Sequence, residues 1–315
     1  MKYRDFEKKV RKVFHLRPKI RSGMVRNNSV GSVIADIAIM VIVGLMAFIC
    51  IIPMWHVLMQ SFSDGYTIAN FDGIALVPQG GFTFRAYEEL FAYRDGIIWR
   101  GYLNTIIYVV GTVGLGLLLN VLAGYCLSRE TKLGKFMTIL CLFSLMFSGG
   151  QAPLYWIITL IGMDEVPYLA VIFTECTMGM YLIMGGIAFR SVPKETVESA
   201  QLEGAGHFRV MFQIMLPQCM GIFMITVLMT FVMAWNSFVG AQLFYGRDED
   251  LFPLQLVLTN LKEDVDGLMM NNPVPYERYP MQFAGVVMAT LPIMIAMPFF
   301  QDQIESGVMT GAIKG

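Results

Sequence analysis

Five side chains that stand inside apolar runs are the residues of this chain best placed to do chemistry. They combine one carboxylate, one amide and three aromatic rings: Glu175, Asn236, Tyr155, Trp156 and Trp235. Such groups can hydrogen-bond and stack against a solute, but no nucleophile, base and acid occur together in the way that covalent catalysis requires. The chemistry they could support is therefore reversible binding along a pathway.

Each of these residues also has a purely structural interpretation. Burying an ionisable group in a membrane costs at least a few kcal/mol, which makes Glu175 a functional candidate, but a partner on another helix would explain it as well. Trp235 and Asn236 could instead be an interfacial aromatic residue and an interhelical hydrogen bond. The Gly-Gly-Gln-Ala-Pro run before Tyr155 could expose backbone carbonyls to a cavity or form a packed kink.

The sequence lacks the motifs of an ATP-hydrolysing or metal-dependent enzyme. The internal Gly134-Lys135 pair has no preceding glycine at phosphate-loop spacing and is followed by Phe136. The five cysteines are scattered singly, and the three histidines lie in separate segments without metal-ligand spacing. We therefore expect no enzymatic activity, no metal and no cofactor on this chain.

A polar stretch in the second half of the chain has the pattern of two short helices around a turn. Glu195 and Glu198 would lie near the positive end of a helix dipole, which favours a helix from about Lys194 to Glu203. Gly204 and Gly206 then punctuate a turn.

The same stretch predicts one face for a partner and one face for packing. Ala200 and Gly204 are small and lie four residues apart, so another surface could approach that face closely. After the turn, apolar residues recur at helical spacing and predict a face packed on the membrane-side helices: Phe208, Met211, Phe212 and Met215. We expect residues 191–217 to be a helix-turn-helix loop that a partner grips.

The composition is that of an all-α, polytopic membrane protein. Of the 315 residues, 56% are hydrophobic and 15% are charged. A spanning helix needs roughly 20 apolar residues. The uncharged stretches predict six spans, the third of them broken in its outer half, at about 33–59, 102–127, 136–160, 166–189, 218–239 and 281–301. The chain would then consist of a basic tail over 1–30, a six-span domain over 31–301 and a C-terminal tail over 302–315.

Basic residues are distributed unequally around the predicted spans. Ten of the 23 Lys and Arg residues lie in the 1–30 tail, which predicts a cytoplasmic N-terminus. With six spans, both termini and the 191–217 loop are cytoplasmic, and the inner segments hold 17 basic residues against 6 in the outer ones. The tail is too long for a signal-peptide n-region, so we expect no cleavage. Nucleic-acid binding is the weaker interpretation of its charge.

Two predicted outer segments, 60–101 and 240–280, are rich in Gly, Pro, Asp and aromatic residues. At about forty residues each they exceed ordinary connections between helices. Simple connection of the spans is one interpretation, and docking of an external partner by ordered loops is the one we favour.

The polar loop resembles the cytoplasmic loop of ABC importer permease subunits, which carries Glu-Ala-Ala, three residues, Gly, nine residues and Ile-x-Leu-Pro. Here the pattern reads Glu198-Ser199-Ala200, Gly204 and Ile214-Met215-Leu216-Pro217, with every spacing kept. The departures from the family pattern are small: Ser199 for Ala, Glu203 for a common Asp, and Gly221 for a frequent Pro. In that family the loop is the coupling helix that seats in a groove of the ATP-hydrolysing subunit.

Other segments resemble carbohydrate-importer permeases of the maltose type. They are residues 235–238, 251–256, 283–292 and 307–315, and the resemblance covers about Phe136 to Gly315 together with the six-span plan. The long tail and residues 147–150 look most like the branch that imports oligosaccharides and polysaccharide fragments.

The resemblance implies an importer of a saccharide in the bacterial plasma membrane. Its implied partners are a second permease subunit, two ATP-binding subunits that carry ATP and Mg, and an extracytoplasmic solute-binding protein. The coupling residues it implies are Glu198, Ser199, Ala200, Leu202, Glu203, Gly204 and Ala205. The five residues named first would then line the pathway, where Trp235 and Asn236 could stack on and hydrogen-bond a sugar.

Other classes of function leave different signatures. An importer of another small solute, such as an amino acid, would share the coupling loop. A self-sufficient secondary carrier should show repeat-related halves and paired intramembrane charges, but no halves match and only Glu175 lies deep in a span. A membrane-embedded enzyme would need a clustered acid, base or metal set.

Overall fold

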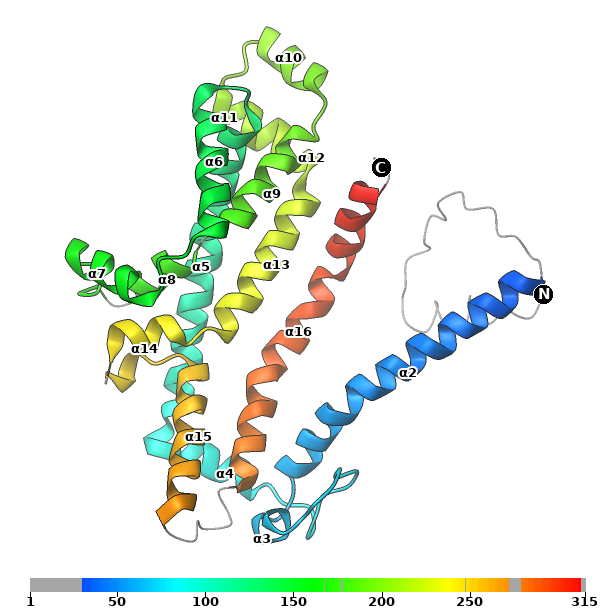
Figure 1. The fold of residues 1–315 in the computed structure, drawn as a ribbon, viewed down its shortest axis with the longest axis vertical. Helices are drawn as coiled ribbons and strands as arrows, with labels where there is room; N and C mark the ends of the chain where they lie inside the picture. The colour runs from blue at the N-terminus through cyan, green and yellow to red at the C-terminus, as the bar shows by residue number, and fades with distance from the viewer. Residues whose placement is uncertain (1–29, 167, 177, 247, 272–278, 313–315) are drawn as a thin grey trace. The chain divides into compact units, whose positions relative to one another are not determined.

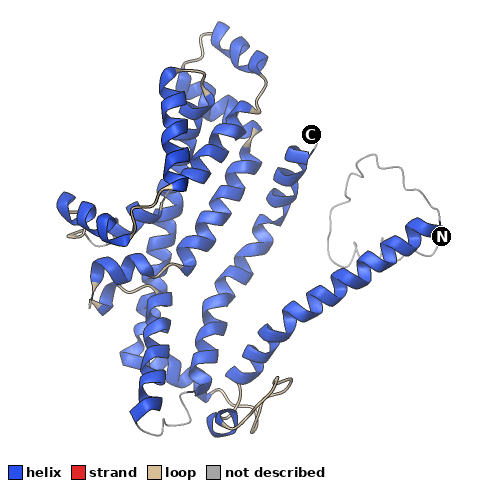
Figure 2. Cartoon of the chain, in the orientation of Figure 1, coloured by secondary structure: helices blue, strands red, loops and turns tan. Residues whose placement is uncertain are grey.

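The computed structural model describes residues 30–166, 168–176, 178–246, 248–271 and 279–312, and every regular element in those ranges is a helix (Figures 1 and 2). The chain divides into two units, residues 1–53 and 54–315. Helix α2 (Val30–Ser61) begins in the first unit and ends in the second. Apart from its last residue, the predicted basic tail lies outside the described residues.

The second unit is built around one long central helix, α5 (Ile97–Ser128). Helices α6 (Lys132–Met146), α8 (Leu169–Glu175), α9 (Gly179–Arg190), α13 (Met220–Asn236) and α15 (Leu254–Asn271) all pack on it. Helix α16 (Tyr279–Ala312) packs on α13 and α15. The shorter elements are α3 (Gly65–Ala69), α4 (Arg85–Ala92), η1 (Tyr93–Gly96), α7 (Gln151–Ile161), α10 (Lys194–Leu202), α11 (His207–Arg209), η2 (Val210–Met215), α12 (Leu216–Gln218), α14 (Val239–Tyr245) and η3 (Glu249–Leu251).

Within the described residues, three helices are long and apolar enough to cross a membrane, and up to five are if each of two bent helix pairs is one span. The three long segments are Ile37–Ser61, Arg85–Ser128 and Tyr279–Gln301. The bent pairs are α8 with α9, at 55°, and His207–Gln218 with α13, at 84°. The six-span count remains a prediction.

Three predicted spans differ in their details from the observed helices. The third, expected at 136–160 with a break, is found as α6 and α7, which are separated at residues 147–150. The fourth, expected as one helix over 166–189, is two helices, because α8 ends at Glu175 and α9 starts at Gly179. The last helix continues beyond the expected boundary at 301 to Ala312, so most of the predicted C-terminal tail is helical.

Small residues let α5 approach its neighbours closely. A Cβ atom on Gly124 would lie 2.8 Å from the backbone carbonyl carbon of Gly185 on α9, and one on Gly116 would overlap the carbonyl oxygen of Cys176. Between these glycines, the amide of Asn120 donates a 3.0 Å hydrogen bond to Thr226 Oγ1 on α13, and both residues are buried. Close backbone contact and an interhelical polar bond are the means by which helices associate where no hydrophobic driving force exists.

Pro292 leaves one hydrogen-bond acceptor free inside α16. Proline has no N–H group, so the carbonyl four residues earlier, that of Met288, loses its donor within the helix. Tyr102 on α5 donates its hydroxyl to that oxygen at 2.7 Å. Trp235 on α13 makes a second interhelical bond nearby, from Nε1–H to the carbonyl of Ala289 at 3.0 Å. The missing amide is therefore replaced by a donor from α5.

The two predicted outer segments are ordered in the parts that the structure describes. Arg94 contacts Glu249 at 2.6 Å and Asp264 at 2.8 Å, which ties η1 to η3 and α15. The Asn104 amide donates to the carbonyls of Asp250 and Phe252, at 2.8 and 3.0 Å. The 240–280 segment is not a loop throughout, because it contains α14, η3 and α15. Its Asn272–Pro275 part lies outside the described residues.

Candidate functional site

Helix α10 is a short helix with a sharply defined end. It covers Lys194–Leu202 and begins directly after Pro193, whose fixed φ suits a helix start. At its C-terminus Gly204 has φ +83°, Ala205 N–H donates to Ala200 O at 3.0 Å, and Gly204 N–H donates to Gln201 O at 3.0 Å. This pair of bonds is a Schellman motif, which needs a residue that tolerates the left-handed conformation. The helix and the glycine turn lie where the sequence predicts them.

One face of α10 is part of the protein's own core. Val197 and Ala200 are buried, at 8% and 9% exposure, in a cluster with Met211, Met215 and Phe189. This corrects the expectation that Ala200 and Gly204 form one open face of small residues. The residues after the glycine turn, 207–215, form the second arm of the loop and pack against Ala200, which explains its small size. Gly204 differs, because a Cβ atom there would meet nothing within 4 Å.

The other face of α10 is open. Glu198, Ser199, Glu203 and Gly204 are exposed, Ala205 is half-buried, and the Leu202 side chain is 90% exposed. The exposed leucine stands beside the carboxylates of Glu198 and Glu203. We call Glu198, Ser199, Leu202 and Glu203 the α10 surface.

The second arm of the loop is only partly packed. Met211 and Met215 are buried as the spacing predicts, but Phe208 is 71% exposed and Phe212 is 41% exposed. The expected four-residue apolar face is therefore wrong for the two phenylalanines. The reason is local geometry: Val210–Met215 is a π-helix, which rotates side chains away from the 3.6-residue period used for the prediction.

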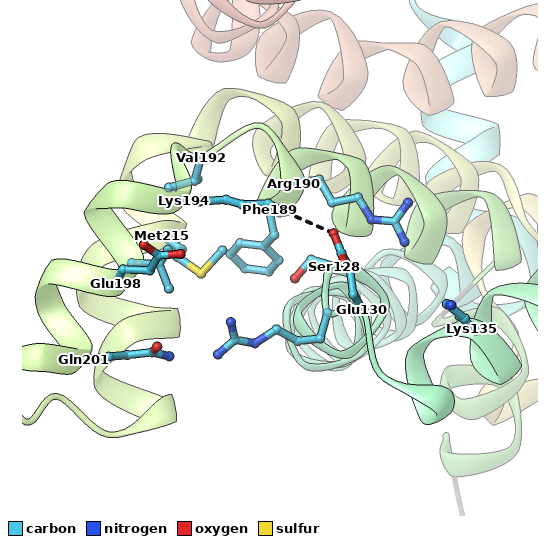
Figure 3. Close-up of a pocket in the computed structure, with 12 residues that line it drawn as sticks. Ser128, Glu130, Lys135, Phe189, Arg190, Val192, Lys194, Glu198, Gln201 and Met215 are labelled. Atoms are coloured by element: carbon cyan, nitrogen blue, oxygen red, sulfur yellow. Dashed lines mark hydrogen bonds and ion pairs between the residues drawn. The ribbon is translucent and has the colours of Figure 1, made fainter.

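A hollow of about 620 Å³ lies beside α10 (Figure 3). We call it the α10 hollow. Its walls include Glu198 and Gln201 from α10, Arg190 from α9, and Glu130 and Lys135 from the α5–α6 turn and α6. Other cations on its walls are Arg129 and Lys194, and the apolar floor includes Phe189, Val197 and Met215.

An ion pair holds the start of α10 to the α5–α6 turn, and a hydrogen bond holds the end of α9 to the end of α5. Lys194 Nζ lies 3.1 Å from Glu130 Oε1, and this contact lowers the pKa of the Glu130 carboxyl below its usual range. Arg190 donates to the carbonyl of Leu127 at 2.6 Å. Both side chains of the ion pair are largely exposed, so the pair orients α10 more than it stabilises the fold.

His207 connects the second arm of the loop to the end of α5. Its Nδ1 lies 3.0 Å from the Tyr125 hydroxyl and 3.3 Å from Arg129 Nη2, and Arg129 also donates to that hydroxyl at 2.7 Å. The Arg129 guanidinium stacks over the Tyr125 ring at 4.8 Å. Because Arg129 can only donate, Nδ1 is the acceptor in this contact.

Glu175, the first of the predicted pathway residues, has a hydrogen-bond partner on a neighbouring segment. Its carboxylate accepts a hydrogen bond from the Ser237 hydroxyl, and a Cβ atom on Gly240 would lie 2.9 Å from the same oxygen. The structure thus favours the partner interpretation of this acid.

The other predicted pathway residues do not come together. Trp235 is 4% exposed and donates Nε1–H to the carbonyl of Ala289 on α16, an interhelical bond that neither interpretation of this residue had included. Tyr155 stacks on Phe244 with ring centroids 6.1 Å apart, and Trp156 is 73% exposed on α7. Asn236 lies elsewhere, on the wall of a second hollow.

This second hollow was not predicted. Its volume is about 590 Å³, and we call it the α13–α15–α16 hollow. Its polar lining residues are Asn236, Gln255, Thr259, Lys262, Gln282 and Thr290. The sequence could have predicted the helix α15 that forms one wall. Apolar residues recur there at helical spacing, in a segment that was assigned to a loop: Leu254, Val257, Leu258, Leu261 and Val265.

Within the described residues, no group of three or more His, Cys, Asp or Glu side chains could hold a metal ion. The arrangement suits protein contact at the α10 surface and reversible solute binding in the hollow among α13, α15 and α16.

Comparisons with known proteins agree with this geometry. Residues 90–310 match the family model described as "Binding-protein-dependent transport system inner membrane component". A polygalacturonan/rhamnogalacturonan transport system permease protein of Bacillus subtilis is 27% identical over 85% of this chain and 94% of its own length. Protein LplC of the same organism is 30% identical over 92% of this chain and 98% of its own length.

The fold also matches a solved structure. A crystal structure of a bacterial ABC transporter involved in the import of the acidic polysaccharide alginate aligns with a TM-score of 0.74, over 88% of this chain and 99% of the other, at 21% identity. At 21% identity the match shows a shared fold and nothing further. On the family match over most of its length, this chain belongs to the inner membrane components of binding-protein-dependent transport systems.

Proposed function

We propose that this chain is the permease subunit of an importer for a saccharide, in particular an oligosaccharide. The support comes from the family match and from a relative of nearly the same length whose name specifies transport of polygalacturonan and rhamnogalacturonan. The largely apolar hollow among α13, α15 and α16 also has amide and hydroxyl side chains on its walls, and these are the kind of hydrogen-bonding groups that a sugar needs.

The single observation that carries the coupling role is the two-sided character of α10. Its Val197 and Ala200 side chains are fixed in the core, while Leu202 on the same short helix is 90% exposed. A rigid element with one face in the core and one face open can transmit a displacement from a partner to the helices behind it. The partner at the α10 surface is an ATP-binding subunit, and its ATP and Mg are not held by this chain.

The route of that displacement starts in the core cluster beneath α10. Met211 and Met215 on the second arm pack against Val197 and Ala200, and the same cluster includes Phe223 on α13. Phe189 at the end of α9 contacts Phe223 with ring centroids 5.0 Å apart. A movement of α10 therefore acts on α9 and α13 together, and these two helices both pack on α5.

In this mechanism ATP-driven closure of two ATP-binding subunits switches the spans between inward and outward access. A second permease subunit completes the pathway, and an extracytoplasmic solute-binding protein delivers the saccharide to the 60–101 and 240–280 segments. Both termini and the α10 surface face the cytoplasm, and the protein resides in the bacterial plasma membrane. Glu198, Ser199, Leu202, Glu203, Gly204 and Ala205 form the joint to the ATPase, with Ala200 as its buried anchor.

The proposal is tested by co-purification and by transport. The tagged chain, expressed with its neighbouring subunits, should bring ATP-binding subunits with it, and the complex in liposomes should hydrolyse ATP faster when a saccharide-loaded binding protein is added. A chain that purifies alone and moves solute without ATP would be a carrier. If a binding protein loaded with an amino acid stimulates ATP hydrolysis and one loaded with a saccharide does not, the chain belongs to an importer of another class of solute.

A further inference from the structure

The α13–α15–α16 hollow has the size and the wall chemistry of a ligand site. Its volume of about 590 Å³ lies within the range of roughly 300–1,000 Å³ that is typical of small-molecule sites. The end of α13, one side of α15 and the first turns of α16 form its walls. Helices of this length hold side chains in place better than loops do, so the site is largely preformed.

Three amide side chains line this hollow. Gln282 Nε2 is buried and has no hydrogen-bond partner among the described residues. Asn236 donates its amide N–H to its own helix at Val232 O, which leaves its carbonyl oxygen as the acceptor facing outward from that bond. Gln255 adds a third amide. Amides both donate and accept, which matches the paired hydroxyls of a sugar ring.

Lys262 is the charged residue on the wall of this hollow. Among the described residues it has no ion-pair partner, and no Asp or Glu lines the hollow with it. Nearby arginines behave differently, because Arg94 pairs with Glu249 and Asp264, and Arg100 pairs with Asp250. Lys262 is exposed, and an ammonium group at a hollow that no Asp or Glu lines attracts an anionic group from outside the chain.

We propose that this hollow binds a saccharide that carries a carboxylate, that is, one with a uronate unit. Lys262 binds the carboxylate, and the amides of Gln282, Gln255 and Asn236 hydrogen-bond the hydroxyls of the ring. This inference rests on the proposed function, since it names the class of saccharide and the residues on this chain that contact it.

The test compares two saccharides of equal length on the complete reconstituted complex. One is an oligogalacturonate, and the other is the same oligosaccharide with its carboxylates methyl-esterified. Binding-protein-stimulated ATP hydrolysis and uptake are measured at saturating binding protein over a range of solute concentrations. Lys262→Gln is compared with Lys132→Gln, a matched change at an exposed lysine on α6 that does not line the hollow.

Lys262→Gln should raise the solute concentration for half-maximal uptake of the oligogalacturonate by about tenfold, the loss of one charge-assisted contact. The ester should be affected less than twofold, and Lys132→Gln should behave as the wild type with both solutes. A second variant, Gln282→Leu, should reduce uptake of both solutes, because its amide contacts hydroxyls and not the carboxylate. Since the binding protein is the same in every assay, these differences come from the permease.

Two results would overturn the inference in distinguishable ways. If both solutes are imported equally well and Lys262→Gln changes neither, the hollow is not a uronate site, while the importer assignment stands. If the wild-type complex imports no saccharide of either kind, the proposed function itself fails and this inference fails with it.

Discussion

Gly124 on α5 and Gly185 on α9 lie backbone to backbone, so that a Cβ atom at position 124 would be 2.8 Å from the carbonyl carbon of Gly185. Real Cβ atoms do not approach other backbones this closely, so an added methyl group must push the two helices apart. Their separation also sets the position of α10, because α9 ends at Arg190, directly before that helix begins.

Gly124→Ala is therefore expected to destabilise the protein by about 1–3 kcal/mol through overpacking. Gly114→Ala is the matched control on the same helix, since a Cβ atom there would meet nothing within 4 Å. Thermal unfolding of the purified complex in lipid nanodiscs measures both. Equal melting temperatures for the two variants would contradict the close contact of α5 and α9.

Charge reversal at Glu198 should uncouple the transporter without unfolding it. Glu198 is exposed on α10, so Glu198→Lys is expected to change stability by no more than about 0.5 kcal/mol. Binding-protein-stimulated ATP hydrolysis should fall to the unstimulated rate. Glu195→Lys, an exposed glutamate in the first turn of the same helix, serves as the control for charge alone. Full stimulation of ATP hydrolysis by the binding protein in the Glu198→Lys variant would show that Glu198 does not take part in the contact with the ATP-binding subunit.

Leu202 and Val197 should respond to truncation in opposite ways. Leu202→Ala removes a side chain that is 90% exposed, so it should leave the melting temperature unchanged and weaken retention of the ATP-binding subunits, by about 1–2 kcal/mol if Leu202 anchors the contact. Val197→Ala empties a site that is 8% exposed and should lower stability by about 1–2 kcal/mol. Melting curves and co-purification yields distinguish the two. A loss of stability in the leucine variant would mean that Leu202 packs inside this chain.

Gly204 should tolerate no other residue without a conformational cost. Its φ of +83° disfavours residues with a Cβ atom, and Gly204→Asp should destabilise the end of α10 by about 1 kcal/mol. The space around it is open, so membrane insertion should persist while stimulated ATP hydrolysis is lost. Gly206→Ala is the control, because Gly206 has φ −70° and also has open space. Unchanged stimulation in Gly204→Asp would contradict the role of this turn.

Acid should loosen the first turn of α10 through the ion pair of Glu130 and Lys194. Lys194 lowers the pKa of Glu130 in the folded state, so the pair contributes above the ordinary glutamate pKa and is lost as the pH falls through the lowered value. Protection of the amides in that turn against hydrogen exchange, relative to their intrinsic exchange rates at each pH, should therefore fall as the pH drops below the ordinary glutamate range. Glu130→Gln should abolish this pH dependence, and Glu203→Gln, an exposed glutamate at the other end of α10, should keep it. An identical acid response in both variants would exclude the pair as its cause.

The local signals in the sequence were sufficient for α10 and for the break before α7. Gly204 follows the end of α10, and the Gly-Gly-Gln-Ala-Pro run stands where α6 and α7 are separated. These features depend on backbone preferences of a few neighbouring residues, and such preferences can be read without knowing the fold.

Features that depend on distant packing were missed. Glu175 interrupts the fourth apolar stretch, but it was weighed as a pathway or partner residue and not as a break, so the separation of α8 from α9 was not predicted. The direction of Ala200 depends on Met211 and Met215, which follow a π-helix turn that the 3.6-residue period does not describe. The sequence left Trp235 open between a pathway role and an interfacial one, and it gave no sign of the hydrogen bond that its Nε1–H donates to a carbonyl 54 residues away.

The proline in α16 also bears on the order in which the helices can assemble. A bare carbonyl in hydrocarbon costs several kcal/mol, so α16 alone would enter lipid with the oxygen of Met288 unsatisfied. The donor that satisfies it, Tyr102, belongs to α5, and the donor to Ala289 belongs to α13. Both helices precede α16 in the chain and are made before it during synthesis. The last long helix thus finds the donor for its unpaired Met288 carbonyl already in the bilayer, and Pro292 makes its stable insertion conditional on the correct placement of α5.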